Sequence, residues 1–142
     1  MLRLLGFIAF SVLLATPSRA QDVREPAPRT EAERNFTLGQ MRLFLQSTQV
    51  ITAAVATGDL QTVAREAAAR GSKATPLSAL PPGMKAKETP AWAGMMAGTR
   101  SGFDELAAAA QTGTAPIKLV GMLGETMGNC VACHAAYKLT AE

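Results

Sequence analysis

The sequence has very few of the side chains on which catalytic sites most often depend. Its 142 residues include a single histidine and two cysteines. One histidine excludes a pair of imidazoles for acid–base work within one chain. The acidic side chains fall mostly where helix caps and polar helix faces are expected, as at Glu33, Asp59 and Asp104. We therefore expect that the protein is not an enzyme.

Aromatic residues are also scarce, at 5% of the chain, whereas alanine is abundant. Alanine favours helix, but each alanine buries little apolar surface. No stretch alternates with period 2 for long enough to predict a strand, and there is no internal repeat. A helical domain of this composition would gain from a large apolar group in its middle.

Long apolar runs are missing except at the N-terminus, where residues 1–20 read MLRLLGFIAFSVLLATPSRA. Arg3, the apolar run from Leu4 to Ala15 and the Ser18–Ala20 site are typical of a cleavable secretory signal. The alternative is an uncleaved anchor, but the run is shorter than the roughly 20 apolar residues that span a bilayer. We expect a periplasmic (exported) protein without a membrane span.

No excess of positive charge remains once the signal is removed. Loss of Arg3 and Arg19 lowers the formal net charge from +3 to +1. The sequence also has no basic stripe of the kind that contacts phosphates. Nucleic acid is therefore not an expected partner.

Four helices are predicted after a flexible leader at 21–30. Thr30 and Glu33 form a capping-box pattern before a first helix, along which apolar residues recur with a period of 3.6. The expected helices lie at residues 31–57, 60–70, 90–112 and 116 onward, the last carrying Tyr137. Gly58 and Gly71 are the expected C-terminal signals of the first two, and Pro90 and Pro116 open the others. Residues 31–142 are thus expected to form an all-α, antiparallel four-helix bundle.

Both cysteines and the histidine fall in one pentapeptide, Cys-Val-Ala-Cys-His. Cys130, Cys133 and His134 are spaced i, i+3, i+4, so their side chains share one face of a helix. This is the signature of covalent haem c attachment, with two thioethers and an imidazole ligand to iron. A thioredoxin-like dithiol, a structural disulfide and a zinc site are alternatives. The first lacks a βαβ context, the second leaves the histidine unexplained, and the third lacks a fourth ligand.

With no second histidine, the sixth position on iron falls to methionine, another weak ligand, water or nothing. Met41 lies mid-face on the first helix, next to Phe44 and Leu45. It is the candidate second metal ligand beside His134, and ordinary core packing is the alternative role.

With these motifs in view, residues 31–142 resemble the class II c-type cytochromes, the cytochrome c-prime family. GETMGNCVACHAAYKL is similar to the family's C-terminal helix, and TPAWAGMMAGTRSGFDELAAAA to its third helix. The resemblance implies one haem bound through Cys130 and Cys133, with His134 as the proximal ligand. It also implies that Lys138 is the basic residue beside the haem, and that Trp92 and Tyr137 pack in the interior.

The resemblance leaves two functions open. Members with a methionine on iron transfer electrons to a redox partner protein, whereas five-coordinate members bind nitric oxide or carbon monoxide behind an apolar distal face. Electron transfer is our first hypothesis, with Met41 as the sixth ligand. High-spin members often form a homodimer through the first two helices, so a homodimer stays open. A helical interaction module without haem is the third reading.

Overall fold

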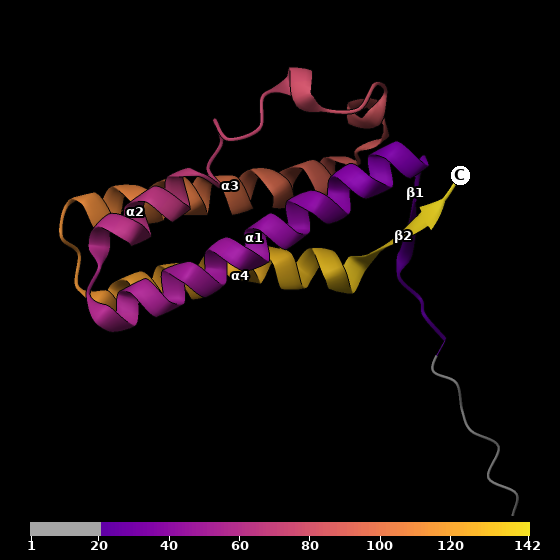
Figure 1. Cartoon of the computed structure of the whole chain (residues 1–142). Helices are drawn as coiled ribbons and strands as arrows, with labels where there is room; N and C mark the ends of the chain where they lie inside the picture. Colours follow the sequence, from indigo (N-terminus) through magenta and orange to yellow (C-terminus); the bar gives the residue numbers. More distant parts are fainter. Residues whose placement is uncertain (1–20) are drawn as a thin grey trace, which may run out of the picture.

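The computed structural model describes residues 21–142, so the expected signal at 1–20 lies outside the described residues. The described chain is mostly helical, with four helices lying side by side (Figure 1). They are α1 (Glu31–Thr57), α2 (Leu60–Ala68), α3 (Pro90–Gln111) and α4 (Pro116–Ala136). Two short 3-10 helices, η1 (Leu77–Ala79) and η2 (Met84–Lys87), interrupt the long connection between α2 and α3. None of the helices within 21–142 is long and apolar enough to cross a membrane.

The helix starts follow the predicted cap chemistry. The Thr30 side chain accepts a hydrogen bond from the Glu33 backbone N–H, and the Glu33 carboxylate accepts one from the Thr30 backbone N–H. Asp59 caps α2, and Thr89 caps α3 with Pro90 in its first turn. Gly58 ends α1 with a φ of 74°, a left-handed conformation that glycine adopts without a steric penalty. The predicted capping box and these boundaries are confirmed.

The end of α2 differs from the prediction, because the helix stops at Ala68 and Gly71 is not its cap. Gly71 is needed for another reason. A Cβ atom at this position would lie 1.8 Å from the Asp104 carboxylate oxygen Oδ1 of α3. The other carboxylate oxygen accepts a hydrogen bond from the Ser72 backbone N–H at 3.0 Å. Because Gly71 has no Cβ atom, the Asp104 side chain of α3 can come close enough to bind the start of the connection between α2 and α3.

Two strands are present where none was predicted. β1 (Glu25–Arg29) lies in the expected flexible leader, and β2 (Tyr137–Ala141) begins where α4 ends. They pair in parallel, with Glu25 opposite Tyr137. The expectation that Tyr137 belongs to the last helix is therefore wrong, because its backbone is already extended. Five residues are too few for an alternating pattern to be recognised in the sequence. The pairing also joins two segments that are distant in the sequence and that only the tertiary fold brings together.

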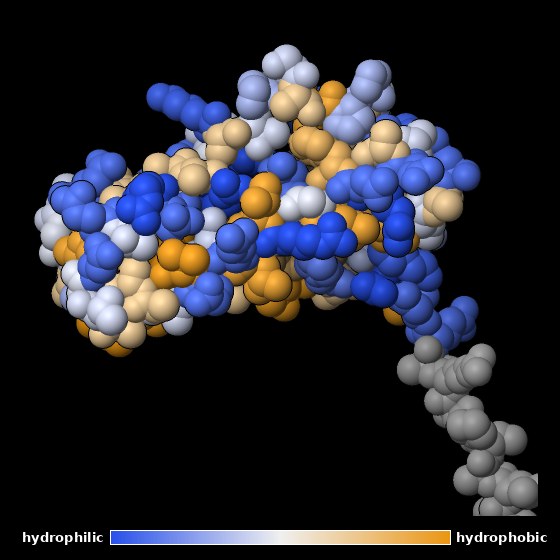
Figure 2. Space-filling view, viewed as in Figure 1, coloured by the Kyte–Doolittle hydropathy of each residue, from blue (hydrophilic) through white to orange (hydrophobic). Residues whose placement is uncertain are grey.

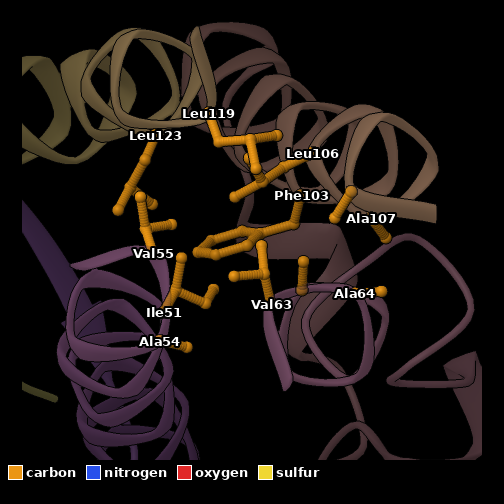
Figure 3. Packing of buried hydrophobic residues seen from close by; sticks show 12 residues of the cluster. Ile51, Ala54, Val55, Val63, Ala64, Phe103, Leu106, Ala107, Leu119 and Leu123 are labelled. Carbon is orange, nitrogen blue, oxygen red and sulfur yellow. The ribbon is translucent and has the colours of Figure 1, made fainter. Parts of the chain in front are cut away.

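The main core fills the part of the molecule that α2 covers. Ile51 and Val55 of α1, Val63 of α2, Phe103 of α3 and Leu119 of α4 meet there (Figure 3). All five side chains are buried. Because α2 has 9 residues and α1 has 27, α2 covers only part of the length of α1. The long connection 69–89 follows α2, and its residues line one of the cavities described below.

Close packing of α3 against α4 fixes the helix that carries the pentapeptide. A Cβ atom on Gly102 would lie 2.3 Å from Thr126 Oγ1, and one on Gly98 would lie 3.2 Å from the Asn129 side chain. Thr126 is buried, and its hydroxyl already donates to the Met122 carbonyl at 2.8 Å. These glycines on α3 let the two helix backbones approach each other closely.

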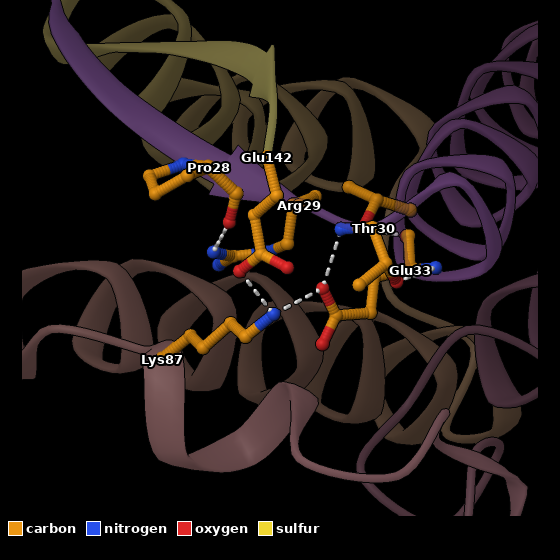
Figure 4. Close-up of polar contacts among 7 residues, drawn as sticks. Pro28, Arg29, Thr30, Glu33, Lys87 and Glu142 are labelled. Carbon is orange, nitrogen blue, oxygen red and sulfur yellow. Dashed lines mark hydrogen bonds and ion pairs between the residues drawn. The ribbon is translucent and has the colours of Figure 1, made fainter.

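A polar network closes the end of the molecule beside the strands. The Lys87 ammonium group contacts Glu33 at 2.8 Å and Glu142 at 2.6 Å, which joins α1, η2 and the C-terminal residue (Figure 4). The Glu33 side chain is only 1% exposed. Arg29 is buried beside this network, and its guanidinium lies 5.2 Å from the centroid of the Trp92 ring.

Candidate haem-binding site

Cys130, Cys133 and His134 line a single cavity of about 350 Å³ between α1, α3 and α4, here called the cysteine cavity. The helical spacing of the three residues places them on one face of α4, as predicted. The wall that α3 contributes is formed by Met95, Met96, Thr99 and Phe103. The cavity therefore has two thiols and an imidazole on one side and mostly apolar groups around them.

The α1 wall of the cysteine cavity includes the predicted candidates. Met41 and Phe44 are half-buried there, and Leu45 is 70% exposed at the rim. Leu38 and Arg42 line the same wall. Phe44 stacks on Phe103 with ring centroids 5.6 Å apart, which fixes the floor of the cavity against the main core. The three predicted α1 residues thus share one cavity with the pentapeptide.

A second cavity of about 480 Å³ lies under the connection 69–89 and is here called the loop cavity. Its apolar wall includes Phe36, Leu80, Met84 and Trp92, and its polar side includes Arg100. Four residues line both cavities and form the wall between them: Met41, Phe44, Met96 and Cys133. The two spaces are therefore neighbours, and one side chain of the pentapeptide reaches both.

The two sulfur atoms are free thiols in partly buried surroundings. Burial raises the pKa of the Cys130 thiol, partly opposed by a hydrogen bond with Thr99. Burial also raises the pKa of the Cys133 thiol, and the nearby Cys130 adds to the effect. Buried neutral thiols of this kind are poor nucleophiles in water. This environment does not favour a thioredoxin-like dithiol, whose reactive cysteine needs a lowered pKa.

The His134 side chain is exposed, and its backbone carbonyl accepts a hydrogen bond from Arg24 at 3.3 Å. The expected basic residue, Lys138, points to the same N-terminal segment. Its ammonium group donates to the Asp22 carbonyl at 2.9 Å and lies 3.8 Å from the Asp22 carboxylate. A hydrogen bond from Arg24 holds the pKa of that carboxyl well below its usual range. Residues 22–24 therefore form a strap beside the end of α4.

Trp92 and Tyr137 are buried, as the resemblance implied, but neither residue lines the cysteine cavity. Trp92 lines the loop cavity, and Tyr137 packs against Trp92 and lines neither cavity. Lys138 likewise lines neither cavity. Of the nine predicted site residues, the structure brings Cys130, Cys133, His134, Met41, Phe44 and Leu45 together around the cysteine cavity.

Sequence reasoning missed several lining residues. Met127 lines the cysteine cavity although it lies one turn before Cys130 on the same helix, and Thr99 approaches from α3. The spacing of Met95, Thr99 and Phe103 at i, i+4, i+8 is a helical stripe that could have revealed Thr99 and Phe103 as part of that wall. Arg100 gave no such signal, because an arginine on a helix most often faces solvent.

Hydrophobic side chains also reach the surface near this region. Figure 2 shows them gathered around the middle of the face that α1 and α4 present, with hydrophilic side chains on either side. Leu45 and Met127 are both exposed and both line the cysteine cavity. The cavity therefore opens to solvent between α1 and α4.

No family model, no curated protein and no solved structure matches this chain. The chemistry of the donor set is therefore the test of what the site could hold. Two free thiols, an adjacent imidazole on the same helix face and an apolar cavity fit a covalently attached porphyrin. A structural zinc ion fits less well, because it needs four ligands and no group of His, Cys, Asp or Glu side chains within residues 21–142 is arranged to hold a metal ion.

Proposed function

We propose that this chain is an exported monohaem c-type cytochrome, an antiparallel four-helix bundle of the cytochrome c-prime kind that acts in electron transfer. The observation that carries the proposal is the shared cavity: both thiols and the only imidazole line one apolar space, with a thioether on the opposite α1 wall. Cys130 and Cys133 would hold the haem covalently, and His134 would be the proximal ligand. When bound, the haem supplies an iron centre that exchanges one electron.

Met41 is the proposed sixth ligand. Its side chain lies in the wall between the two cavities, on the helix that faces α4 across the cysteine cavity. A thioether ligand stabilises ferrous iron relative to a second imidazole, which raises the reduction potential.

A second function, binding of nitric oxide or carbon monoxide, is favoured by the other residues of the α1 wall. Leu38, Phe44 and Leu45 are apolar and surround Met41. If Met41 only packs against its neighbours, this wall leaves a space suited to a small neutral molecule. The two functions thus differ by the role of one side chain.

Three measurements test these proposals. Expression in a host that attaches haem c should give a coloured protein whose mass increases by one haem, and Cys130→Ala with Cys133→Ala should abolish the increase. A colourless wild-type protein would overturn the haem proposal. The wild-type absorption spectrum should be low-spin, and Met41→Ala should convert it to high-spin.

Matched controls come from the other methionines of the same cavity. Met95→Ala and Met96→Ala remove the same side chain from α3 and should leave the iron low-spin. If Met41→Ala leaves the spectrum unchanged and the ferrous wild-type protein binds carbon monoxide readily, gas binding replaces electron transfer as the function. If an α3 methionine variant becomes high-spin instead, the sixth ligand is on α3.

A further inference from the structure

Arg100 places a positive charge at the loop cavity, and no carboxylate of residues 21–142 forms a salt bridge with it. Its guanidinium lies 5.5 Å from the centroid of the Phe44 ring and donates one hydrogen bond, to the Gly71 carbonyl at 3.2 Å. A guanidinium has five donors, so most of its hydrogen-bonding capacity is unused by residues 21–142. The Arg100 side chain is half-buried, and this burial lowers its pKa.

The other charged groups nearby do not neutralise the positive charge of Arg100. Lys85 and Glu88 also line the loop cavity, but they pair with each other. Asp104 attracts Arg100, yet its carboxylate is held by the Ser72 backbone N–H and is also attracted to Lys73. Arg70 repels Arg100. Within the described chain the Arg70 Nε atom is buried without a hydrogen-bond partner. Positive charge is therefore in excess beside this cavity.

The loop cavity and the cysteine cavity share lining residues. Cys133 lines both cavities, and Met41, Phe44 and Met96 complete the wall between them. Arg100 and Cys133 both line the loop cavity, so a group attached at Cys133 that extends past this wall would enter the same cavity as Arg100. The apolar residues on the way suit an apolar body, and the guanidinium suits a carboxylate at its end.

We propose that Arg100 binds a carboxylate of the group attached at Cys133, which in the proposed cytochrome is a haem propionate. This inference rests on the proposed function, because the haem is the source of the carboxylate. Arg100 acts here as a positioning residue, since it fixes the carboxylate end and does not ligate iron. It also stabilises the charged form of that carboxylate and lowers its pKa.

The test is the pH dependence of the reduction potential of the haem-loaded protein, which reports the pKa of a propionate linked to the iron. Arg100→Gln should raise that pKa by about 1 to 3 pH units, because an opposite charge beside a carboxyl lowers its pKa by about that amount. Arg100→Lys keeps the positive charge but lacks the planar guanidinium group, so it should raise the propionate pKa less. The mass of each variant checks that haem is still attached.

Two controls make the outcome specific to this position. Arg65→Gln removes the same charge from an exposed site on α2 and should leave the pKa unchanged. Arg42→Gln removes the rival arginine, which lines the cysteine cavity. If Arg42→Gln shifts the pKa and Arg100→Gln does not, the proposal is wrong even though the protein is a cytochrome.

A carboxylate from solution is the remaining source of the same chemistry. Benzoate is a suitable probe, and in the loaded wild-type protein it should not change the potential or its pH dependence, because the propionate already occupies Arg100. If benzoate binds the wild-type protein and not Arg100→Gln, the haem-borne source is excluded. A wild-type protein without covalent haem would instead overturn the proposed function, and the mass measurement separates that failure from the others.

Discussion

The rings of Tyr137 and Trp92 pack edge to face, with centroids 5.3 Å apart and ring planes inclined by 69°. Tyr137 follows α4 directly, and Trp92 lies in the first turn of α3. The contact therefore ties the end of the helix that carries the pentapeptide to the start of its neighbour. The Tyr137 hydroxyl adds a hydrogen bond with Thr89 Oγ1 at 3.0 Å.

This hydrogen bond gives the first prediction. Tyr137→Phe keeps the ring contact but removes the hydroxyl, so the free energy of unfolding in urea should fall by about 0.5–1.5 kcal/mol. In a Thr89→Ala background the same change should cost much less, because the partner is already missing. Thr89→Ala alone should also lower stability, since Thr89 caps α3. Equal costs of Tyr137→Phe in both backgrounds would show that the bond does not form.

The second prediction concerns the network around Lys87. The hydrogen bond from Lys87 lowers the pKa of the Glu33 carboxyl below its usual 4.5, so its contribution to stability is complete above about pH 4.5. That contribution is lost as the pH falls through the lowered pKa. Glu142 and Glu33 raise the pKa of Lys87 above 10.5, so the amine contributes fully below that pH and less as the pH rises through the raised pKa.

Thermal melting between acidic and alkaline pH measures both effects. Lys87→Met should lower the melting temperature most near neutral pH. Toward acidic and alkaline pH, the melting temperature of the variant should fall less steeply than that of the wild-type protein. The control is Lys118→Met, because Lys118 is exposed and has no ion pair within residues 21–142. Parallel curves for the wild-type protein and Lys87→Met would contradict the assignment.

The third prediction compares two glycines of the same helix. Gly102→Ala should destabilise the protein by about 1–3 kcal/mol, because its Cβ atom would overlap the buried Thr126 side chain of α4. Gly94→Ala has no atom within 4 Å of the new Cβ atom and should stabilise α3 by about 0.5–1 kcal/mol. Chemical denaturation of both variants gives the comparison. A stabilised Gly102→Ala variant would mean that α3 and α4 are farther apart than described.

The sequence predicts the helices well because their signals are local. Thr30 with Glu33, Gly58, Asp59 and Thr89 each act within one turn of chain, and each is found in its expected role. The i, i+3, i+4 spacing likewise predicts that the pentapeptide faces one cavity. Local periodicity on α1 also points Met41 toward that cavity.

Features that depend on distant partners could not be read in the same way. The strand at Glu25–Arg29 exists through pairing with residues more than 100 positions away, and its five residues carry no alternating pattern. Gly71 looked like a helix terminus, but its role comes from the approach of Asp104. Arg100 gave no local signal, because only the fold places it beside Phe44 and leaves it without a salt bridge among residues 21–142.

The last prediction concerns the thiols of Cys130 and Cys133 in protein prepared without haem. Because burial raises both pKa values, little thiolate exists near neutral pH, and the thiolate is the species that reacts with iodoacetamide. Alkylation of the folded chain at about pH 7 should therefore be slower than alkylation of the same chain in urea, as measured by mass spectrometry, and should speed up as the pH rises. In the haem-loaded protein neither sulfur should be alkylated, even in urea, because both would be in thioether bonds. Alkylation of both cysteines in a coloured sample would show that the haem is held without covalent attachment, and equal rates in the folded and unfolded apo chains would show that the thiols are not buried.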